Sequence, residues 1–305
     1  MKFVTFQHGP AVAGSEGAPG LWLDGKGVLD LQLAAELKGE TLDARSMTAV
    51  IAGGTAALAA VRRLADDPPA DAVLPAGEVT LLAPIPRPAK NVFCVGRNYA
   101  AHVREGDRMF DRQAELPTVP NFFTKPPTTV VGPDAEVRWP SALTQAFDYE
   151  VELGVIIGKS GRDIPRDQAL DHVFGYTIIN DVTARDLQLS HVQWFKGKGL
   201  DTTCPMGPWI IDAGEIGDPT TLEVSLHLNG EARQRATTDM MIFDVPAIIA
   251  SLSAGMTLEP GDVIATGTPA GVGFAMQPKG LLKGGDVMEC RIDRIGLLRN
   301  TVVEV

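Results

Sequence analysis

The chain has 305 residues, of which 45% are hydrophobic, and a formal net charge of −11. This length and composition suit one large domain with a smaller one attached. The acidic balance argues against nucleic acid or an anionic membrane surface as the main partner. Residues 1–6 lack the apolar core of a secretory signal, and no apolar run is long enough to span a bilayer. Because Cys94, Cys204 and Cys290 are odd in number and far apart, we expect reduced thiols and a cytoplasmic protein.

Residues 1–70 form the first predicted unit, a small α+β domain. Its strands are expected at residues 2–6 and 20–31, with a turn at Asp24-Gly25, and its helices at residues 31–37 and 47–64. A segment rich in Pro and Ala then leads into the second predicted domain, residues 71–305.

The second domain reads as short strands separated by Gly and Pro, with few helices. After residue 204 the pattern is almost entirely that of β-strands, which favours a sandwich or a barrel-like core. The fold class expected is therefore α+β and predominantly β. The exceptions are a helical turn at residues 97–105, helices at 163–172 and 245–252, and an irregular loop at 106–120.

Residues 147–158 carry the most informative pattern. Glu150 and Glu152 alternate with Val151 and Leu153, so both carboxylates leave the same face of one strand. A hard divalent ion such as Mg²⁺ or Mn²⁺ would relieve their repulsion. Asp181 ends a later apolar run and adds a third carboxylate. The pattern alone favours a different interpretation, in which both Glu residues lie on a solvated strand face and Asp181 caps a helix.

Several other polar residues are candidates for chemistry. His102 and Glu105 are spaced i, i+3, so the carboxylate could hold one imidazole nitrogen while the other takes a proton. Spacing alone favours an ordinary surface pair. Residues 266–273 follow a strand and predict a tight turn that offers backbone N–H groups and the Thr268 hydroxyl. Lysines that could bind a carboxylate or polarise a carbonyl, although lysines beside Gly are usually solvated, are Lys125, Lys196 and Lys198.

The sequence lacks the motifs of serine hydrolases and of dinucleotide-binding enzymes. It contains no Gly-x-Ser-x-Gly elbow and no dinucleotide fingerprint after the first strand.

Taken together, these stretches resemble the fumarylacetoacetate hydrolase family, from about residue 79 to the end of the chain. The order of the motifs carries the resemblance. They are Gly96-Arg-Asn-Tyr-Ala-Ala-His102, Phe123-Thr-Lys-Pro126, Asp148-Tyr-Glu-Val-Glu-Leu-Gly-Val-Ile-Ile-Gly-Lys159, Asn180-Asp-Val-Thr-Ala-Arg-Asp-Leu-Gln188, Gly197-Lys-Gly-Leu-Asp-Thr202, Gln234 with Thr238 and Met241, and Thr266-Gly-Thr-Pro-Ala-Gly-Val-Gly273.

The resemblance implies a mixed β-sandwich roll, a homodimer and a full site. The metal ligands implied are Glu150, Glu152 and Asp181, holding Mg²⁺ or Mn²⁺, with Ca²⁺ as a further candidate. The catalytic residues implied are His102, Glu105 and Lys198. The substrate contacts implied are Arg97, Lys125, Gln188, Gln234 and Thr268.

The activity implied is hydrolysis of a C–C bond in a 2,4-dioxo acid, such as an acylpyruvate, through a metal-bound enolate. Two alternatives share that enolate: a decarboxylase of oxaloacetate-like acids, and an isomerase or hydratase of a 2-hydroxy-dienedioate in aromatic catabolism. A non-catalytic metabolite-binding protein is a further alternative. The segment 106–117 looks longer than in the shortest members, and Gly199-Leu200-Asp201 stands where many members have Ser-Phe-Asp.

Overall fold

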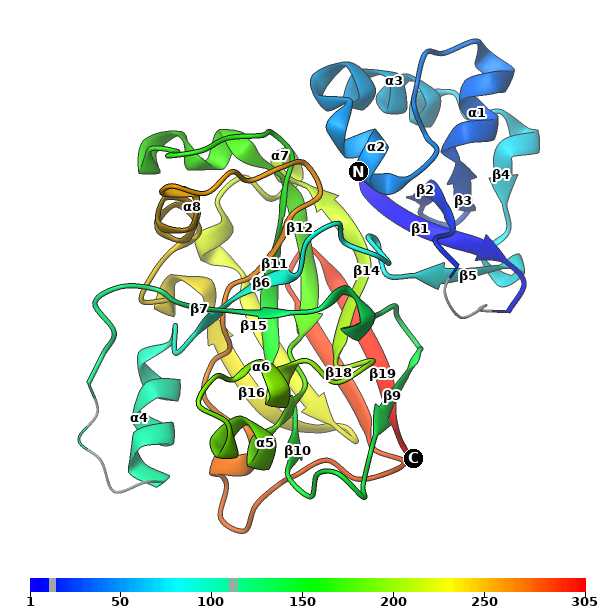
Figure 1. The fold of residues 1–305 in the computed structure, drawn as a ribbon. Coiled ribbons are helices and arrows are strands. Elements are labelled where there is room, and N and C mark those ends of the chain that lie inside the picture. Colours follow the sequence, from blue (N-terminus) through cyan, green and yellow to red (C-terminus); the bar gives the residue numbers. More distant parts are fainter. Residues whose placement is uncertain (11–14, 110–112, 114) are drawn as a thin grey trace.

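The structure is a computed structural model that describes residues 1–10, 15–109, 113 and 115–305. A small unit at the N-terminus lies beside a larger body built around two β-sheets (Figure 1). This architecture confirms the predicted α+β, predominantly β class. None of the helices in the described part of the chain has the length and apolar character that crossing a bilayer requires.

The N-terminal unit combines an antiparallel sheet with three helices. Asp30 begins the first helix by accepting a hydrogen bond from the Leu33 amide, and Ser46 caps the second in the same way. The single helix expected at residues 47–64 is divided in two, because the second helix ends at Gly53. The strands are β1 (Lys2–His8), β2 (Ala18–Leu23), β3 (Gly27–Asp30), β4 (Val73–Leu74) and β5 (Val79–Leu82), and the helices are α1 (Leu31–Lys38), α2 (Met47–Ala52) and α3 (Gly54–Asp66).

One large sheet runs through both units, because β1 pairs with a strand of the larger body, with Phe3 opposite Ile210. The strand order is β4-β3-β2-β1-β14-β12-β11-β17-β6-β7, with β5 beside β1 and β8 beside β14. The predicted division near residue 70 remains a prediction. The added strands are β6 (Val92–Gly96), β7 (Asn121–Lys125), β8 (Val130–Val131), β11 (Val151–Ile157), β12 (Val173–Asn180), β14 (Cys204–Asp212) and β17 (Val263–Ala265).

A second sheet packs against the first and completes the sandwich. Leu153 of β11 belongs to the apolar cluster shared with Leu226 and Cys290 of the second sheet, whereas Ile156 belongs to the cluster shared with the N-terminal unit. Strand β11 is therefore buried on both faces. The second sheet has the order β16 (Glu231–Thr237), β15 (Glu223–Leu228), β18 (Val287–Ile292), β19 (Gly296–Glu304) and β9 (Glu136–Trp139), and a separate pair is formed by β10 (Phe147–Asp148) and β13 (Thr183–Ala184).

Short helices connect these strands. The helix expected at residues 163–172 is a 3₁₀ helix that begins at Arg166. The helical turn expected at 97–105 begins later, at Ala100, since Arg97 has a left-handed φ of 58°. The α-helices are α4 (Ala100–Met109), α5 (Arg185–Ser190), α6 (Phe195–Lys198), α7 (Ala213–Ile216) and α8 (Val245–Ser253). The 3₁₀ helices are η1 (Ala70–Ala72), η2 (Ala76–Glu78), η3 (Pro127–Thr129), η4 (Arg166–His172), η5 (Pro219–Thr221), η6 (Thr238–Met240) and η7 (Gly273–Ala275).

The shared sheet predicts that the two units unfold together. Phe3 is fully buried, and its ring centroid lies 4.9 Å from that of Phe174 in the larger body. Phe3→Ala should lower the free energy of unfolding by about 3–5 kcal/mol. Urea unfolding should then show one transition, shifted as a whole, by both circular dichroism and tryptophan fluorescence. The exposed Leu37 is the control, and Leu37→Ala should change stability by less than about 0.5 kcal/mol. Two separate transitions, with only the first shifted, would contradict the shared core.

Candidate active site

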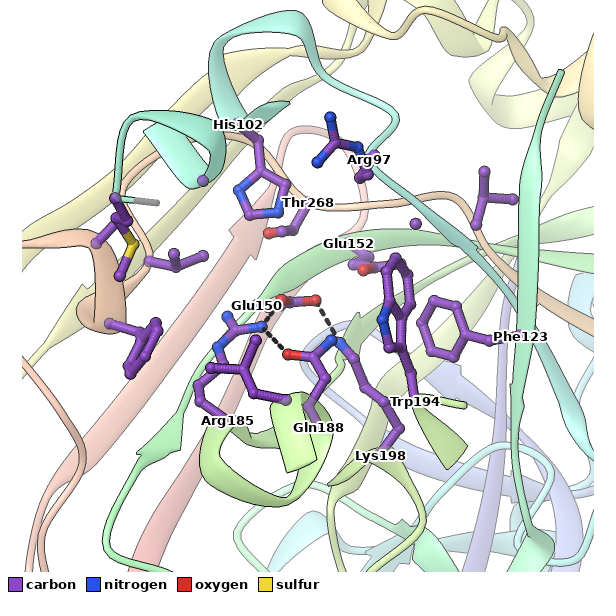
Figure 2. Close-up of a pocket in the computed structure, with 18 residues that line it drawn as sticks. Arg97, His102, Phe123, Glu150, Glu152, Arg185, Gln188, Trp194, Lys198 and Thr268 are labelled. Carbon is purple, nitrogen blue, oxygen red and sulfur yellow. Dashed lines mark hydrogen bonds and ion pairs between the residues drawn. The ribbon is translucent and has the colours of Figure 1, made fainter. Parts of the chain in front are cut away.

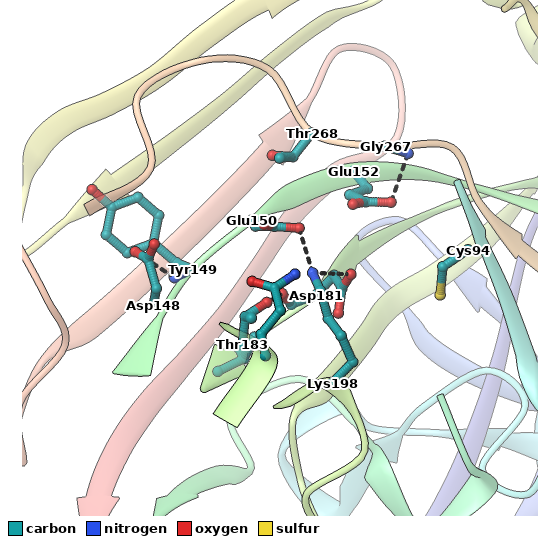
Figure 3. A network of polar contacts seen from close by, with 12 residues as sticks. Cys94, Asp148, Tyr149, Glu150, Glu152, Asp181, Thr183, Lys198, Gly267 and Thr268 are labelled. Atoms are coloured by element: carbon teal, nitrogen blue, oxygen red, sulfur yellow. Dashed lines mark hydrogen bonds and ion pairs between the residues drawn. The ribbon is translucent and has the colours of Figure 1, made fainter. Parts of the chain in front are cut away.

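Three buried carboxylates, those of Glu150, Glu152 and Asp181, converge beside strand β11 of the large sheet (Figure 3). One oxygen from each of Glu150, Glu152 and Asp181 lies within 4.8 Å of the others. Glu150 directly precedes β11 and Glu152 lies within it, so the two side chains, two positions apart, leave the same face. The antiparallel pairing of β11 with β12 places Val151 opposite Asn180. Asp181 follows directly, and its amide donates to the Glu150 carbonyl at 2.8 Å. Strand alternation and strand register together bring the three carboxylates to one point.

The burial of this cluster excludes the two ordinary interpretations of the sequence pattern. Glu150, Glu152 and Asp181 are 5%, 1% and 0% exposed, so the solvated strand face is wrong. Asp181 does not cap α5, because the residue at the cap position is Ala184. Buried carboxylates need compensating charge or hydrogen bonds to be stable.

Three basic side chains supply part of that compensation. Lys198 Nζ donates to Glu150 Oε2 at 2.8 Å and to Asp181 Oδ2 at 2.7 Å. Arg185 Nη1 lies 2.7 Å from Glu150 Oε1, and Lys125 Nζ lies 2.8 Å from Asp181 Oδ1. Lys198 and Arg185 outweigh the effect of burial and lower the pKa of Glu150 to about 2.

Glu152 is the carboxylate left without a matching cation. Its Oε2 accepts a hydrogen bond from the Gly267 amide at 2.7 Å, and among the described residues no basic side chain forms an ion pair with it. Burial, followed by the charges of Asp181 and Glu150, raises the pKa of Glu152 well above its usual range. A divalent cation between the three carboxylates would remove this imbalance. The all-oxygen donor set fits hard ions such as Mg²⁺, Mn²⁺ or Ca²⁺.

A histidine and a glutamate on α4 form a pair next to the carboxylates, and the histidine lines the same cavity as Glu150 and Glu152. His102 Nδ1 is 2.9 Å from Glu105 Oε1, as the i, i+3 spacing predicted. The Gly271 amide donates to Glu105 Oε2 at 2.9 Å and so fixes the carboxylate from the other side. Gly271 has a φ of 106°, and a Cβ there would lie 2.1 Å from the Arg233 carbonyl oxygen, so only glycine fits. With Nδ1–H donated to Glu105, His102 Nε2 is the nitrogen left to accept a proton.

Glu150, Glu152 and His102 line one cavity of about 130 Å³, and Asp181 is not part of its lining (Figure 2). Most of its wall is apolar, and Phe123 and Trp194 form an edge-to-face aromatic pair with ring centroids 5.5 Å apart. The predicted site residues that line the cavity are Arg97, His102, Glu150, Glu152, Gln188, Lys198 and Thr268.

Two predicted substrate contacts lie behind this wall. Lys125 is fully buried and donates to the main-chain carbonyls of Val182 and Lys198, besides its ion pair with Asp181. Gln234 Nε2 donates to Thr268 Oγ1 at 2.8 Å. Both side chains therefore hold cavity residues in place and do not line the cavity themselves. Lys196 is exposed on α6. Part of the predicted loop at 106–117 lies outside the described residues.

Sequence reasoning missed Arg185, Trp194 and Asp148. Arg185 lies in the first turn of α5, four residues after Asp181, and it lines the cavity. That spacing was the one available signal for it. Trp194 and Phe123 become neighbours only through folding, because they are 71 positions apart in the chain.

The chain matches a known protein family and several solved structures over most of its length. The family description "Fumarylacetoacetate (FAA) hydrolase C-terminal" matches residues 91–303. The chain belongs to the fumarylacetoacetate hydrolase family. An oxaloacetate tautomerase of Bacillus subtilis is 45% identical over 291 residues, which cover 93% of this chain and 95% of that protein. Membership identifies the chain as an enzyme of this family, while the reaction type and the predicted homodimer stay predictions.

Two solved structures of the fumarylacetoacetate hydrolase family share the fold along the whole chain. A fumarylacetoacetate hydrolase from psychrophilic Exiguobacterium antarcticum is 41% identical, with a TM-score of 0.80 and 100% of both chains covered. A maleylpyruvate hydrolase from Sphingobium sp. SYK-6, in complex with manganese(II) and pyruvate, is 31% identical, with a TM-score of 0.77 and coverage of 100% of this chain and 99% of that one.

The unbalanced charge of Glu152 generates a test of the candidate metal site. Glu152→Gln removes one repulsive charge, so the metal-free protein should keep or gain thermal stability. The same variant should bind Mn²⁺ at least about tenfold more weakly, roughly 1.4 kcal/mol, in calorimetric titration.

The matched control is Asp212→Asn, because Asp212 is also buried and accepts an amide hydrogen bond at the end of β14. That variant should bind Mn²⁺ like the wild type. Unchanged Mn²⁺ affinity in Glu152→Gln would show that these carboxylates do not hold the ion.

Proposed function

We propose that this enzyme is a divalent-metal-dependent tautomerase of a small 2-oxo dicarboxylic acid such as oxaloacetate, which interconverts its keto and enol forms. The observation that carries the proposal is the His102–Glu105 pair, whose imidazole lines the same small cavity as Glu150 and Glu152. The oxaloacetate tautomerase of Bacillus subtilis, similar over 93% of this chain, supports the same reaction.

The proposed metal ligands are Glu150, Glu152 and Asp181. A divalent cation bound there would supply positive charge beside the oxygens of the substrate, which favours enolisation. The cluster is open to the cavity through Glu150 and Glu152, so a ligand in the cavity can reach the site.

His102 is the proposed general base. Glu105 accepts the Nδ1 proton at 2.9 Å and keeps the imidazole in the tautomer whose Nε2 is free. Nε2 removes a proton from the carbon between the carbonyl and the distal carboxylate, and it then returns a proton to the carbonyl oxygen. The keto form becomes the enol with no net gain or loss of protons, and the reverse sequence regenerates the keto form.

The size of the cavity favours a small acid as the substrate. Its volume of about 130 Å³ is close to the roughly 150 Å³ of an engineered cavity that binds benzene. A four-carbon dicarboxylic acid is of similar size, whereas a seven-carbon dienedioate is much longer. Three cationic side chains line the cavity, namely Arg97, Arg185 and Lys198. Each is already paired with a carboxylate of the protein, but their positive charge favours an anionic substrate.

Hydrolysis of a C–C bond in a 2,4-dioxo acid is the second candidate. The same His102 Nε2 could take its proton from water, and the hydroxide formed would attack a carbonyl. The similarity over the whole chain to the maleylpyruvate hydrolase bound to manganese and pyruvate favours this candidate. The two candidates differ in whether the carbon chain is cleaved. A tautomerase gives an isomer of its substrate, and a hydrolase gives two carboxylic acids.

A substrate panel with Mn²⁺ distinguishes the two candidates. The wild type should speed the change in ultraviolet absorbance of oxaloacetate as enol converts to keto, above the spontaneous rate, and a chelator should abolish this effect. Chromatography should find no more of any other carboxylic acid than a control with Mn²⁺ and no enzyme. Turnover of acylpyruvates to two acids, with no effect on oxaloacetate, would replace the tautomerase by the hydrolase.

The role of His102 gives a further prediction. His102→Asn should lower kcat for oxaloacetate by about 10²–10⁴-fold, because the proton acceptor is lost, while calorimetry should find the Mn²⁺ affinity unchanged. His227→Asn, which alters a part-buried histidine on β15, serves as the control and should keep wild-type turnover. Full activity of His102→Asn would exclude His102 as the base.

A further inference from the structure

Asp148 lies behind the candidate metal site and joins four neighbouring groups. It ends β10 and is fully buried. Its Oδ1 accepts from the amides of Gly273 at 2.8 Å and Tyr149 at 3.0 Å. Its Oδ2 accepts from the Phe274 amide at 3.1 Å and from Arg185 Nε at 2.9 Å. A buried carboxylate with this many donors is held firmly in one orientation.

Arg185 links Asp148 to the candidate metal site. Arg185 Nε donates a hydrogen bond to Asp148 Oδ2 at 2.9 Å, and Nη2 on the same edge of the guanidinium also lies 2.9 Å from that oxygen. The remaining nitrogen, Nη1, lies 2.7 Å from Glu150 Oε1 (Figure 2). The other oxygen of Glu150 is contacted by Lys198. Arg185 therefore touches Glu150 at one point only, although a guanidinium can pair with a carboxylate at two.

We propose that Asp148 is a positioning residue that prevents Arg185 from forming a two-point ion pair with Glu150. This inference rests on the proposed metal site. A two-point pair would bring a second guanidinium nitrogen to Glu150 Oε2, the oxygen that Lys198 already contacts, and would compete with a cation for it. By holding Nε, with Nη2 2.9 Å away, Asp148 confines Arg185 to Oε1, so a metal competes for Oε2 with Lys198 alone. Residues one step behind a metal ligand commonly influence affinity in this way.

The same carboxylate also fixes the loop that reaches the His102–Glu105 pair. Gly273 and Phe274 donate their amides to Asp148, and Gly271, two positions earlier, donates to Glu105. A Cβ on Gly273 would lie 2.8 Å from Asp148 Oδ1 and 2.2 Å from the Gly280 carbonyl oxygen, so glycine permits the close approach. The loop amides thus hold the Asp148 carboxylate in place, so it does not move toward Glu150 with Arg185.

The test is calorimetric titration of the full chain with Mn²⁺. Asp148→Asn removes the charge that engages Arg185 and should weaken Mn²⁺ binding by about 10–100-fold. Asp148→Glu retains a carboxylate and should bind Mn²⁺ more tightly than Asp148→Asn. The control Asp212→Asn makes the same chemical change at a buried aspartate at the far end of β14 and should bind like the wild type.

A second substitution separates positioning from simple loss of structure. In the double variant Asp148→Asn/Arg185→Met the competing guanidinium is absent, so Mn²⁺ affinity should recover relative to Asp148→Asn. Arg185→Met alone should bind Mn²⁺ at least as tightly as the wild type, which keeps the test valid if Asp148→Asn fails to fold.

The outcomes distinguish the role of Asp148 from the existence of the metal site. Wild-type affinity in Asp148→Asn, or no recovery in the double variant, would overturn the role of Asp148 while leaving the metal site intact. No Mn²⁺ binding by the wild type would overturn the metal site and this inference together.

Discussion

Carboxylates that are buried side by side repel one another, and much of this structure serves to hold three of them together. Glu150, Glu152 and Asp181 present oxygens within 4.8 Å of one another at a place almost without solvent. The chain answers with basic side chains from three separate segments, namely Lys125 at the end of β7, Arg185 on α5 and Lys198 on α6. Their positive charge reaches Glu150 and Asp181 but leaves Glu152 uncompensated. This partial compensation is the physical reason to expect a divalent cation. If each of the three carboxylates were paired with a basic side chain, no uncompensated negative charge would remain to attract a metal.

The sandwich fold makes this arrangement possible. Strand β11 lies in the interior of the large sheet, between β12 and β17, with apolar clusters on both faces. Antiparallel register then fixes Asp181 beside Glu150, so the geometry depends on backbone pairing and not on flexible side chains. The glycine-rich turn after β17 completes the site with its amides. Gly267 donates to Glu152 and Gly271 to Glu105, and these two bonds tie the candidate metal site and the candidate base to one short loop.

Strand periodicity was enough to predict the predominantly β class, because alternation is a local property of the chain. The grouping of Glu150, Glu152 and Asp181 as metal ligands came from the family resemblance, since the pattern alone favoured a solvated strand face and a helix cap. The His102–Glu105 contact was likewise readable from helical spacing. Long-range pairing was not readable, because nothing in the sequence says that β1 joins β14. The same limit hid Asp148, whose partners in the loop at 273–274 are about 125 positions away. Lys125 was expected to contact the substrate because sequence cannot distinguish a lysine that faces a cavity from one that supports its wall.

The central claim is that the three carboxylates hold one divalent cation. Anomalous diffraction from crystals grown with Mn²⁺ tests it most directly. The account predicts a single strong peak with an oxygen of Glu150, of Glu152 and of Asp181 at about 2.0–2.6 Å, the range of hard cations. A fully occupied peak elsewhere, or no peak between these residues at millimolar Mn²⁺ while Lys198 still bridges Glu150 and Asp181, would contradict it.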